Sequence, residues 1–132
     1  MGVTPYLYYE DVEAALTFLA NAFSFRTFGE QVRDGQGRLT HAAAQLGENV
    51  VMMGCPGPAY RSPRRLGQAT FSLYVNIDDV DAHFTQAKAA GAKIIEDPTD
   101  TPYGDRRYGV TDLEGHEWYF ATPSSAGGTE QR

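Results

Sequence analysis

Three histidines and one cysteine are the side chains of this chain best suited to bind a metal ion or to act as a nucleophile. They are scattered, and no His-x-x-x-His or Cys-x-x-Cys spacing brings two of them together on one element. We expect His83 to be solvated on a helix and His116 to stabilise a turn beside Gly115. Cys55 has no partner for an intrachain disulfide, and we expect its thiol to be packed and inert.

Arginine clusters offer a second kind of chemistry, the binding of an anion. The clusters are Arg61, Arg64 and Arg65 in one segment and Arg106 and Arg107 in another. Such side chains could clamp a carboxylate or a phosphonate through bidentate hydrogen bonds. We favour a simpler interpretation, in which they are solvated loop charges. The chain has no serine-nucleophile elbow and no phosphate-binding glycine motif, which argues against hydrolase and nucleotide chemistry.

Aromatic side chains with polar ends are the strongest candidates for ligand binding. Because a strand alternates its side chains between two faces, Tyr6 and Tyr8 should share one face, and Tyr74 and Asn76 should share another. Flat rings with hydroxyl ends can stack on a planar ligand and form hydrogen bonds with its edge. The predicted ligand-binding residues are Tyr6, Tyr8, Met52, Tyr60, Tyr74, Asn76, Tyr103, Trp118 and Tyr119.

The elements that must position these residues form two similar halves. A shift of 68 residues places Asp11-Val12-Glu13-Ala14 on Asp79-Val80-Asp81-Ala82, and Gly47 on Gly115. Each half begins with a β-branched and aromatic strand, continues with an amphipathic helix, and ends in three strands. The expected strands are 3–9, 25–33, 38–46 and 49–54 in the first half and 69–77, 92–97, 106–112 and 116–122 in the second.

Local signals predict where several of these elements begin and end. Pro5 lacks a backbone N–H, so the first strand should lie at the edge of a sheet. Asp11 should cap the first helix, because its side chain can accept hydrogen bonds from free backbone N–H groups. Asp78 or Asp79 should cap the second helix, and Gly91 should end it in a left-handed conformation.

Together these elements predict an α+β fold made of two tandem βαβββ modules. We assign residues 1–55 and 69–123 to the modules, 56–68 to a linker and 124–132 to a disordered tail, so that residues 1–123 form a single domain. The eight strands should curve into an open trough, with the helices on its outer face. The sequence leaves open whether one chain forms the trough or two chains share it.

Length, composition and charge narrow the range of functions. A chain of 132 residues has the size of one domain. Its net charge of −6 argues against nucleic-acid binding, which depends on concentrated positive charge. The longest apolar run, at 50–53, is far too short to cross a bilayer. Glu10 and Asp11 lie where a signal peptide would be apolar, so we expect none. We therefore expect a soluble cytoplasmic protein that binds neither nucleic acid nor membranes.

The order of these motifs resembles a known family. The paired modules, the Asp-Val-x-Ala helix starts and the Asp-Leu-Glu-Gly-His-Glu-Trp stretch at 112–118 are similar to the vicinal oxygen chelate superfamily. That superfamily includes glyoxalase I, extradiol dioxygenases and bleomycin resistance proteins. The Thr-Pro-Tyr-Leu opening at 4–7 and the Trp-x-Phe-Ala ending look most like its PhnB-like branch. The resemblance covers about residues 3–123 and implies the same trough.

The same resemblance implies where catalytic members hold their metal, on the first and last strands of each module. Those positions carry Thr4, Val51 or Met52, Ser72, and Tyr119 or Phe120. None of these residues offers the imidazole nitrogen or carboxylate oxygen that divalent transition metals prefer. We therefore expect neither a metal nor another cofactor. An unusual metal site built from His41 and Glu117 stays open as an alternative.

These observations predict a metal-free protein of the bleomycin-resistance type. Its trough would sequester a bulky, partly planar aromatic small molecule, such as an aromatic or peptide antibiotic, and no catalytic residue is assigned. Two alternatives stay open: a metal-dependent glyoxalase- or dioxygenase-like enzyme, and a regulatory subunit that binds no small ligand. The resemblance also implies a homodimer, in which the two chains could exchange modules.

Overall fold

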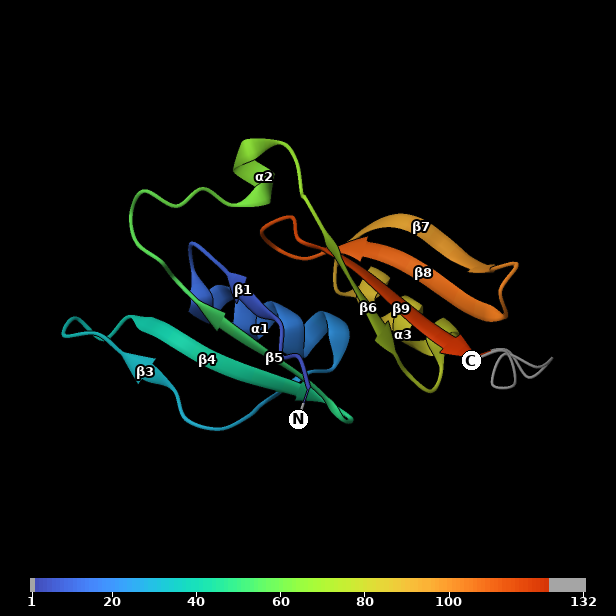
Figure 1. Ribbon diagram of the computed structural model, residues 1–132, viewed down its shortest axis with the longest axis horizontal. Coiled ribbons are helices and arrows are strands. Elements are labelled where there is room, and N and C mark those ends of the chain that lie inside the picture. Colours follow the sequence, from blue (N-terminus) through green and yellow to red (C-terminus); the bar gives the residue numbers. More distant parts are fainter. Residues whose placement is uncertain (1, 124–132) are drawn as a thin grey trace.

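The computed structural model describes residues 2–123, which form two β-sheets with helices packed on one side (Figure 1). The first module contains β1 (Tyr6–Tyr8), α1 (Val12–Phe23), β2 (Arg26–Thr27), β3 (Val32–Arg33), β4 (Leu39–Leu46) and β5 (Asn49–Gly54). The short helix α2 (Pro63–Leu66) follows. The second module contains β6 (Ser72–Asn76), α3 (Val80–Ala89), β7 (Lys93–Asp100), β8 (Asp105–Thr111) and β9 (Glu117–Pro123). The predicted α+β fold is confirmed, while the tail predicted at 124–132 lies outside the described residues.

Each sheet has its first strand at an edge, beside its last strand. The strand order is β1–β5–β4–β2 in the first sheet, where β3 also pairs with β4, and β6–β9–β8–β7 in the second. Both edge strands run parallel to their neighbours, with Tyr6 opposite Met52 and Tyr74 opposite Tyr119. The edge position predicted from Pro5 is therefore confirmed.

The helices α1 and α3 begin in the same way, as the sequence repeat predicts. The Asp11 carboxylate accepts a hydrogen bond from the backbone N–H of Ala14 at 3.0 Å, and Asp79 does the same for Ala82 at 3.1 Å. A cap of this kind stabilises a helix by about 1 kcal/mol. Gly91 follows α3 with a φ of 89°, which confirms the predicted left-handed ending. No helix within residues 2–123 is long and apolar enough to cross a bilayer.

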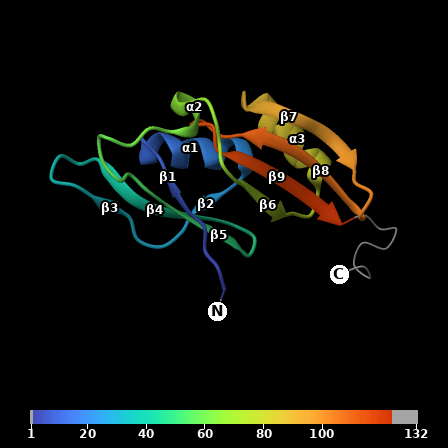
Figure 2. The same cartoon turned by 45° about the horizontal axis from the view of Figure 1, so that its top comes forward.

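The hydrophobic core lies between the helices and the covered faces of both sheets. Phe23, at the end of α1, places its ring 5.5 Å from that of Trp118 and 4.9 Å from that of Phe120, both on β9. These contacts join the two modules, and full burial of one such ring contributes roughly 1.5–3 kcal/mol. Figures 1 and 2 show α1 and α3 on the same side of the sheets, so that the opposite faces stay uncovered.

His83 on α3 is buried, which corrects the expectation that it is solvated. Its Nε2 lies 2.8 Å from the backbone carbonyl oxygen of Phe23, and its Nδ1 lies 2.6 Å from the Tyr108 hydroxyl. Burial lowers the pKa of His83, so the neutral ring is favoured. A neutral ring can donate from Nε2 and accept at Nδ1, which satisfies both contacts. The sequence pattern of α3 could not predict this, because the carbonyl belongs to the other module.

The strand predicted at 25–33 is present only as two short pieces, β2 and β3. Gly29 lies between them with a φ of 71°, a left-handed conformation that interrupts an extended strand. The described residues therefore contain nine strands where eight were expected. The remaining strands agree with their predicted ranges to within a few residues.

The linker predicted at 56–68 is fixed to both modules. It contains α2, and the backbone N–H of Arg64 donates to the carbonyl oxygen of Glu114 at 2.9 Å, in the β8–β9 turn. Glu10, between β1 and α1, accepts a hydrogen bond from the backbone N–H of Ser62 at 2.8 Å. A proline- and glycine-rich composition therefore marks an irregular connection here, but one that both modules hold in place.

The Glu10 carboxylate should make this attachment sensitive to acid. The hydrogen bond from the Ser62 backbone N–H, together with that from Arg65, lowers the pKa of Glu10 from 4.5 to about 2. Because the folded-state pKa is depressed, the contribution of Glu10 to stability is complete above 4.5 and is lost as the pH falls toward 2. We expect Glu10→Gln to flatten the pH dependence of the urea-unfolding midpoint in this window. Glu48→Gln, in an exposed turn, is the control. An equal effect of both variants would contradict the claim that the Glu10 carboxylate stabilises the attachment of the linker.

Candidate functional site

Each sheet leaves one face uncovered, on the side away from α1 and α3. Strand alternation places Tyr6 and Tyr8 on this side of the first sheet, where they are 48% and 51% exposed. Tyr74 lies on the same side of the second sheet and is 44% exposed. The neighbouring Leu7 and Val75 point into the core and are buried. The alternation expected from the sequence therefore leaves these tyrosine rings free to meet a ligand.

The first face, as we call it, consists of Tyr6, Tyr8, His41, Met52 and Tyr60. The rings of Tyr6 and Tyr8 meet edge to face with centroids 6.0 Å apart, and Tyr60 meets Tyr8 in the same way at 5.8 Å. The Tyr60 hydroxyl donates to the backbone carbonyl of Tyr8 at 3.0 Å. Burial raises the pKa of Tyr60 to about 12, which keeps this donor protonated at neutral pH. The Tyr6 hydroxyl lies 2.9 Å from Nδ1 of His41, so its position is also fixed.

Two cavities open on the first face. One, of about 600 Å³, lies beside Thr4, His41 and Met52. The other, of about 340 Å³, lies between β1 and the linker. Both volumes fall within the ~300–1,000 Å³ typical of small-molecule sites. The large apolar and aromatic side chains that line the smaller cavity include Tyr6, Tyr8, Tyr60, Leu66 and Phe71.

The second face consists of Tyr74, Asn76, Tyr103, Arg107 and Tyr119. The rings of Tyr74 and Tyr119 are nearly parallel, at 19°, with centroids 6.5 Å apart. The Arg107 guanidinium lies 5.2 Å from the centre of the Tyr119 ring, and its Nε donates to Glu96 at 2.8 Å. The hydrogen bond with Glu96 raises the pKa of Arg107, which stays charged. The Tyr103 hydroxyl accepts from Arg107 at 3.1 Å, so these groups form one connected network.

Two glycines that the sequence analysis did not single out allow the tyrosine rings to lie close to the sheets. A Cβ on Gly54 in β5 would collide with the Tyr6 hydroxyl, and a Cβ on Gly109 in β8 would lie 2.6 Å from Cε1 of the Tyr119 ring. Neither glycine has a positive φ, so the backbone conformation does not require glycine here. Glycine is required because the tyrosine ring leaves no room for a Cβ. An isolated glycine within a strand is the one sequence signal that could have indicated such a close approach.

Gly109→Ala should displace the Tyr119 ring from the second face. We expect a shift of the Tyr119 ring resonances in NMR spectra and a loss of stability of about 1–3 kcal/mol from overpacking. Gly35→Ala is a matched control, because a Cβ there meets nothing within 4 Å. Unchanged Tyr119 resonances in Gly109→Ala would contradict the proposed role of this glycine.

The prediction that Trp118 binds a ligand is wrong. Its ring is fully buried, and its Nε1 donates to Oδ2 of Asp112 at 3.0 Å. Alternation along β9 turns Trp118 toward the core and Tyr119 toward the open side. His116 does more than stabilise its own turn, because its Nε2 lies 2.8 Å from the backbone carbonyl oxygen of Tyr8 in the other module.

Comparison with known proteins identifies the family. The model of the Glyoxalase/Bleomycin resistance protein/Dioxygenase superfamily matches residues 3–120. The chain belongs to this superfamily. It is 32% identical over 128 residues to the uncharacterized protein Rv0887c of Mycobacterium tuberculosis, a match that covers 92% of this chain and 74% of that protein. The uncharacterized protein Mb0911c of Mycobacterium bovis has the same identity, and 83% of its length is covered.

Several solved structures share this architecture. The crystal structure of TioX from Micromonospora sp. ML1 is 34% identical, with a TM-score of 0.74 and coverage of 96% of this chain and 98% of that chain. A glyoxalase-related enzyme from Clostridium phytofermentans has a TM-score of 0.70 at 15% identity, over 93% of this chain and 95% of that chain. At that identity the likeness is one of fold alone.

The strand register decides which residues occupy the positions where catalytic members of the superfamily are expected to hold a metal. Met52 lies on the first face and Tyr119 on the second, whereas Val51 and Phe120 are buried. The four positions therefore carry Thr4, Met52, Ser72 and Tyr119. Hydroxyls, a thioether and a phenol do not fit a divalent transition metal, which prefers imidazole, thiolate or carboxylate ligands. Within residues 2–123 no three His, Cys, Asp or Glu side chains gather in a group that could hold a metal ion.

The alternative metal site at His41 and Glu117 is not assembled. His41 lines the cavity on the first face, whereas Glu117 begins β9 and lines a separate cavity beside Arg64 and Lys93. Nδ1 of His41 is also engaged by the Tyr6 hydroxyl at 2.9 Å. Neither residue therefore supplies a ligand to a common centre.

Several of the clustered arginines are engaged within the protein, which corrects their interpretation as solvated loop charges. The ion pairs are Arg65–Glu10, Arg106–Asp81, Arg106–Asp100 and Arg107–Glu96. Within residues 2–123, Arg61 and Arg64 form no ion pair and donate to backbone carbonyl oxygens. Of the two, Arg64 lines a cavity outside the tyrosine faces.

Proposed function

We propose that this protein binds a bulky, partly planar aromatic small molecule at its tyrosine faces, without a metal. The observation that carries the proposal is the chemistry of the open faces. Positioned phenol rings line them, and hydroxyl and thioether groups stand where a metal would need nitrogen or carboxylate ligands. The family description includes bleomycin resistance proteins, which supports an antibiotic as the ligand. Sequestration would keep such a compound from its target without any covalent step.

Positioned rings favour affinity for two physical reasons. The hydrogen bonds of Tyr6, Tyr60 and Tyr74 hold these rings before a ligand arrives, so less side-chain freedom is lost on binding. A well-oriented aromatic pair also adds about 0.5–1.5 kcal/mol beyond the burial of its area. Met52, with its flexible thioether, can adapt to an irregular ligand outline.

We also propose that two copies of the chain share the trough. The two faces belong to separate sheets, and the edge strands β1 and β6 each pair on one side only within the described residues. A second copy could bring the first face of one chain toward the second face of its partner. Sedimentation at micromolar concentrations should show a dimer. A monomer at every concentration would refute the shared trough but leave ligand binding at each face intact.

Calorimetric titration with a panel of planar aromatic and peptide antibiotics tests the binding proposal. Fluorescence of Trp118 is a poor reporter, because this residue is buried in the core. For the tightest ligand, we expect Tyr119→Ala to weaken binding at least about tenfold and Tyr119→Phe to weaken it less than about threefold. Thr85→Ala, on the outer helix, should bind as the parent does. Full affinity in Tyr119→Ala and Tyr74→Ala, with folding verified by urea unfolding, would contradict the proposal.

A further inference from the structure

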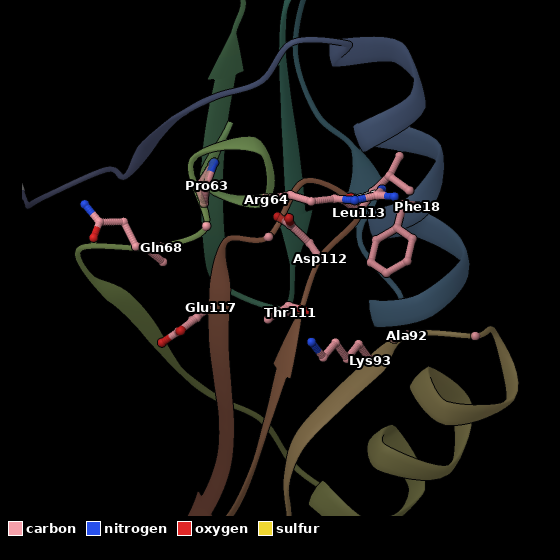
Figure 3. Close-up of a pocket in the computed structure, with 14 residues that line it drawn as sticks. Phe18, Pro63, Arg64, Gln68, Ala92, Lys93, Thr111, Asp112, Leu113 and Glu117 are labelled. Carbon is pink, nitrogen blue, oxygen red and sulfur yellow. Dashed lines mark hydrogen bonds between the residues drawn. The ribbon is translucent and has the colours of Figure 1, made fainter. Parts of the chain in front are cut away.

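A separate cavity of about 560 Å³ lies at the end of the second sheet (Figure 3). None of its lining residues belongs to either tyrosine face. Three turns meet around it, at Gly67 after α2, at Gly91 after α3 and at Gly115 between β8 and β9. These glycines have φ values of 80°, 89° and 94°, so each turn depends on a left-handed residue.

Three charged side chains on the wall of this cavity have no ion-pair partner. Arg64, Lys93 and Glu117 all line it, and within residues 2–123 none of them lies within 4.0 Å of an opposite charge. Figure 3 shows Arg64 at the upper wall, Lys93 at the lower wall and Glu117 on β9 at the left. The two cations lie on opposite walls, and the Glu117 carboxylate extends from β9 on the side away from both, so the three charges do not neutralise one another.

The strand register keeps two of these charges apart. Lys93 lies opposite Thr111, and Thr111 lies opposite Glu117, so the three form a row across β7, β8 and β9. Directly opposed residues point to the same face of a sheet. Neighbouring strands lie about 4.8 Å apart, so the backbones of Lys93 and Glu117 are separated by about 10 Å, with a neutral hydroxyl between them.

Arg64 is held at the cavity by its backbone and by its side chain. Its backbone N–H donates to the Glu114 carbonyl oxygen at 2.9 Å, and its guanidinium donates to that of Leu113 at 3.4 Å. A guanidinium has five N–H donors, so most of its donors stay free for a ligand. Asp112 also lines the cavity, but both of its carboxylate oxygens accept hydrogen bonds from within the protein.

We propose that this cavity binds a small zwitterion whose two charges lie at the ends of an aliphatic chain. Arg64 and Lys93 would bind the carboxylate, and Glu117 would bind the ammonium group. Phe18 and Leu113 provide apolar surface for the aliphatic chain on the wall beside Arg64. None of the three charged groups belongs to the tyrosine faces as defined above, so either proposal can fail without the other.

Three probes of the same length separate the two charges: 6-aminohexanoate, hexanoate and hexylamine. In ¹H–¹⁵N NMR titrations at constant ionic strength, we expect 6-aminohexanoate to bind at least about tenfold more tightly than either singly charged probe. The amide signals of Gly67, Gly91 and Gly115 should shift, whereas those of Tyr6 and Met52 on the first face should not.

Charge-removing variants then assign each group. Arg64→Gln and Lys93→Gln should each weaken the binding of 6-aminohexanoate and of hexanoate about tenfold. Glu117→Gln should weaken the binding of 6-aminohexanoate and of hexylamine. Lys88→Gln is the control, because Lys88 lies over the Phe84 ring on α3, outside the cavity. Equal binding of the three probes, no saturation up to about 10 mM, or full affinity in the three cavity variants would each overturn the proposal.

Discussion

Replacement of Asp112 by alanine is expected to lower the free energy of unfolding by about 3–5 kcal/mol. The Asp112 carboxylate accepts four hydrogen bonds in a buried position. Oδ2 accepts from the Tyr9 hydroxyl at 2.5 Å and from Nε1 of Trp118 at 3.0 Å. Oδ1 accepts from the backbone N–H groups of Glu114 and His116 at 3.0 and 3.1 Å. The variant would leave several of these buried donors without a partner, and Tyr9 would lose its hydrogen bond to the other module.

Urea unfolding measures this effect against a matched substitution. Asp97→Ala removes the same group from an exposed position on β7 and should change stability by less than about 0.5 kcal/mol. Tyr9→Phe removes one donor and should cost less than Asp112→Ala, because a phenylalanine leaves no buried hydroxyl behind. Equal stabilities of Asp112→Ala and Asp97→Ala would show that the buried carboxylate does not hold the modules together.

Gly115→Ala is expected to cost about 2–5 kcal/mol, from two sources. The φ of 94° at Gly115 is unfavourable for a residue with a Cβ, which accounts for about 1–2 kcal/mol. An added Cβ would also lie 2.7 Å from the backbone nitrogen of Arg64, so α2 must move away from the β8–β9 turn. Overpacking of this kind adds about 1–3 kcal/mol.

Gly47→Ala separates the two sources. Gly47 has a φ of 59°, but a Cβ there meets nothing within 4 Å, so only the conformational cost applies. We expect the urea-unfolding free energy of Gly115→Ala to fall below that of Gly47→Ala by at least about 1 kcal/mol. Indistinguishable stabilities would mean that α2 is not packed against this turn.

The sequence predicted the features that depend on local pattern. The aspartate caps at Asp11 and Asp79 follow from a side-chain oxygen placed just before an apolar helical stripe. The exposure of Tyr6, Tyr8 and Tyr74 follows from the two-residue period of a strand. The offset between the halves predicted the repeated order of elements, because equal spacing of caps and turns requires similar modules.

Features that depend on distant partners could not be predicted in this way. Trp118, Tyr119 and Phe120 are all aromatic, so their order alone does not show which of them faces the core. Only the pairing of β9 with β6 fixes that phase. His83 and His116 are bound by carbonyl oxygens of the other module, which no local pattern contains.

The central claim is that the tyrosine faces bind their ligand without a metal. The most direct test measures the dissociation constant of the tightest antibiotic from the panel by calorimetry, first after chelator treatment and dialysis, then with added Zn²⁺, Ni²⁺, Mn²⁺ or Fe²⁺. Since the expected metal positions carry Thr4, Met52, Ser72 and Tyr119, we predict the same constant within about twofold in every case. Binding or turnover that appears only when one of these ions is restored would contradict the account.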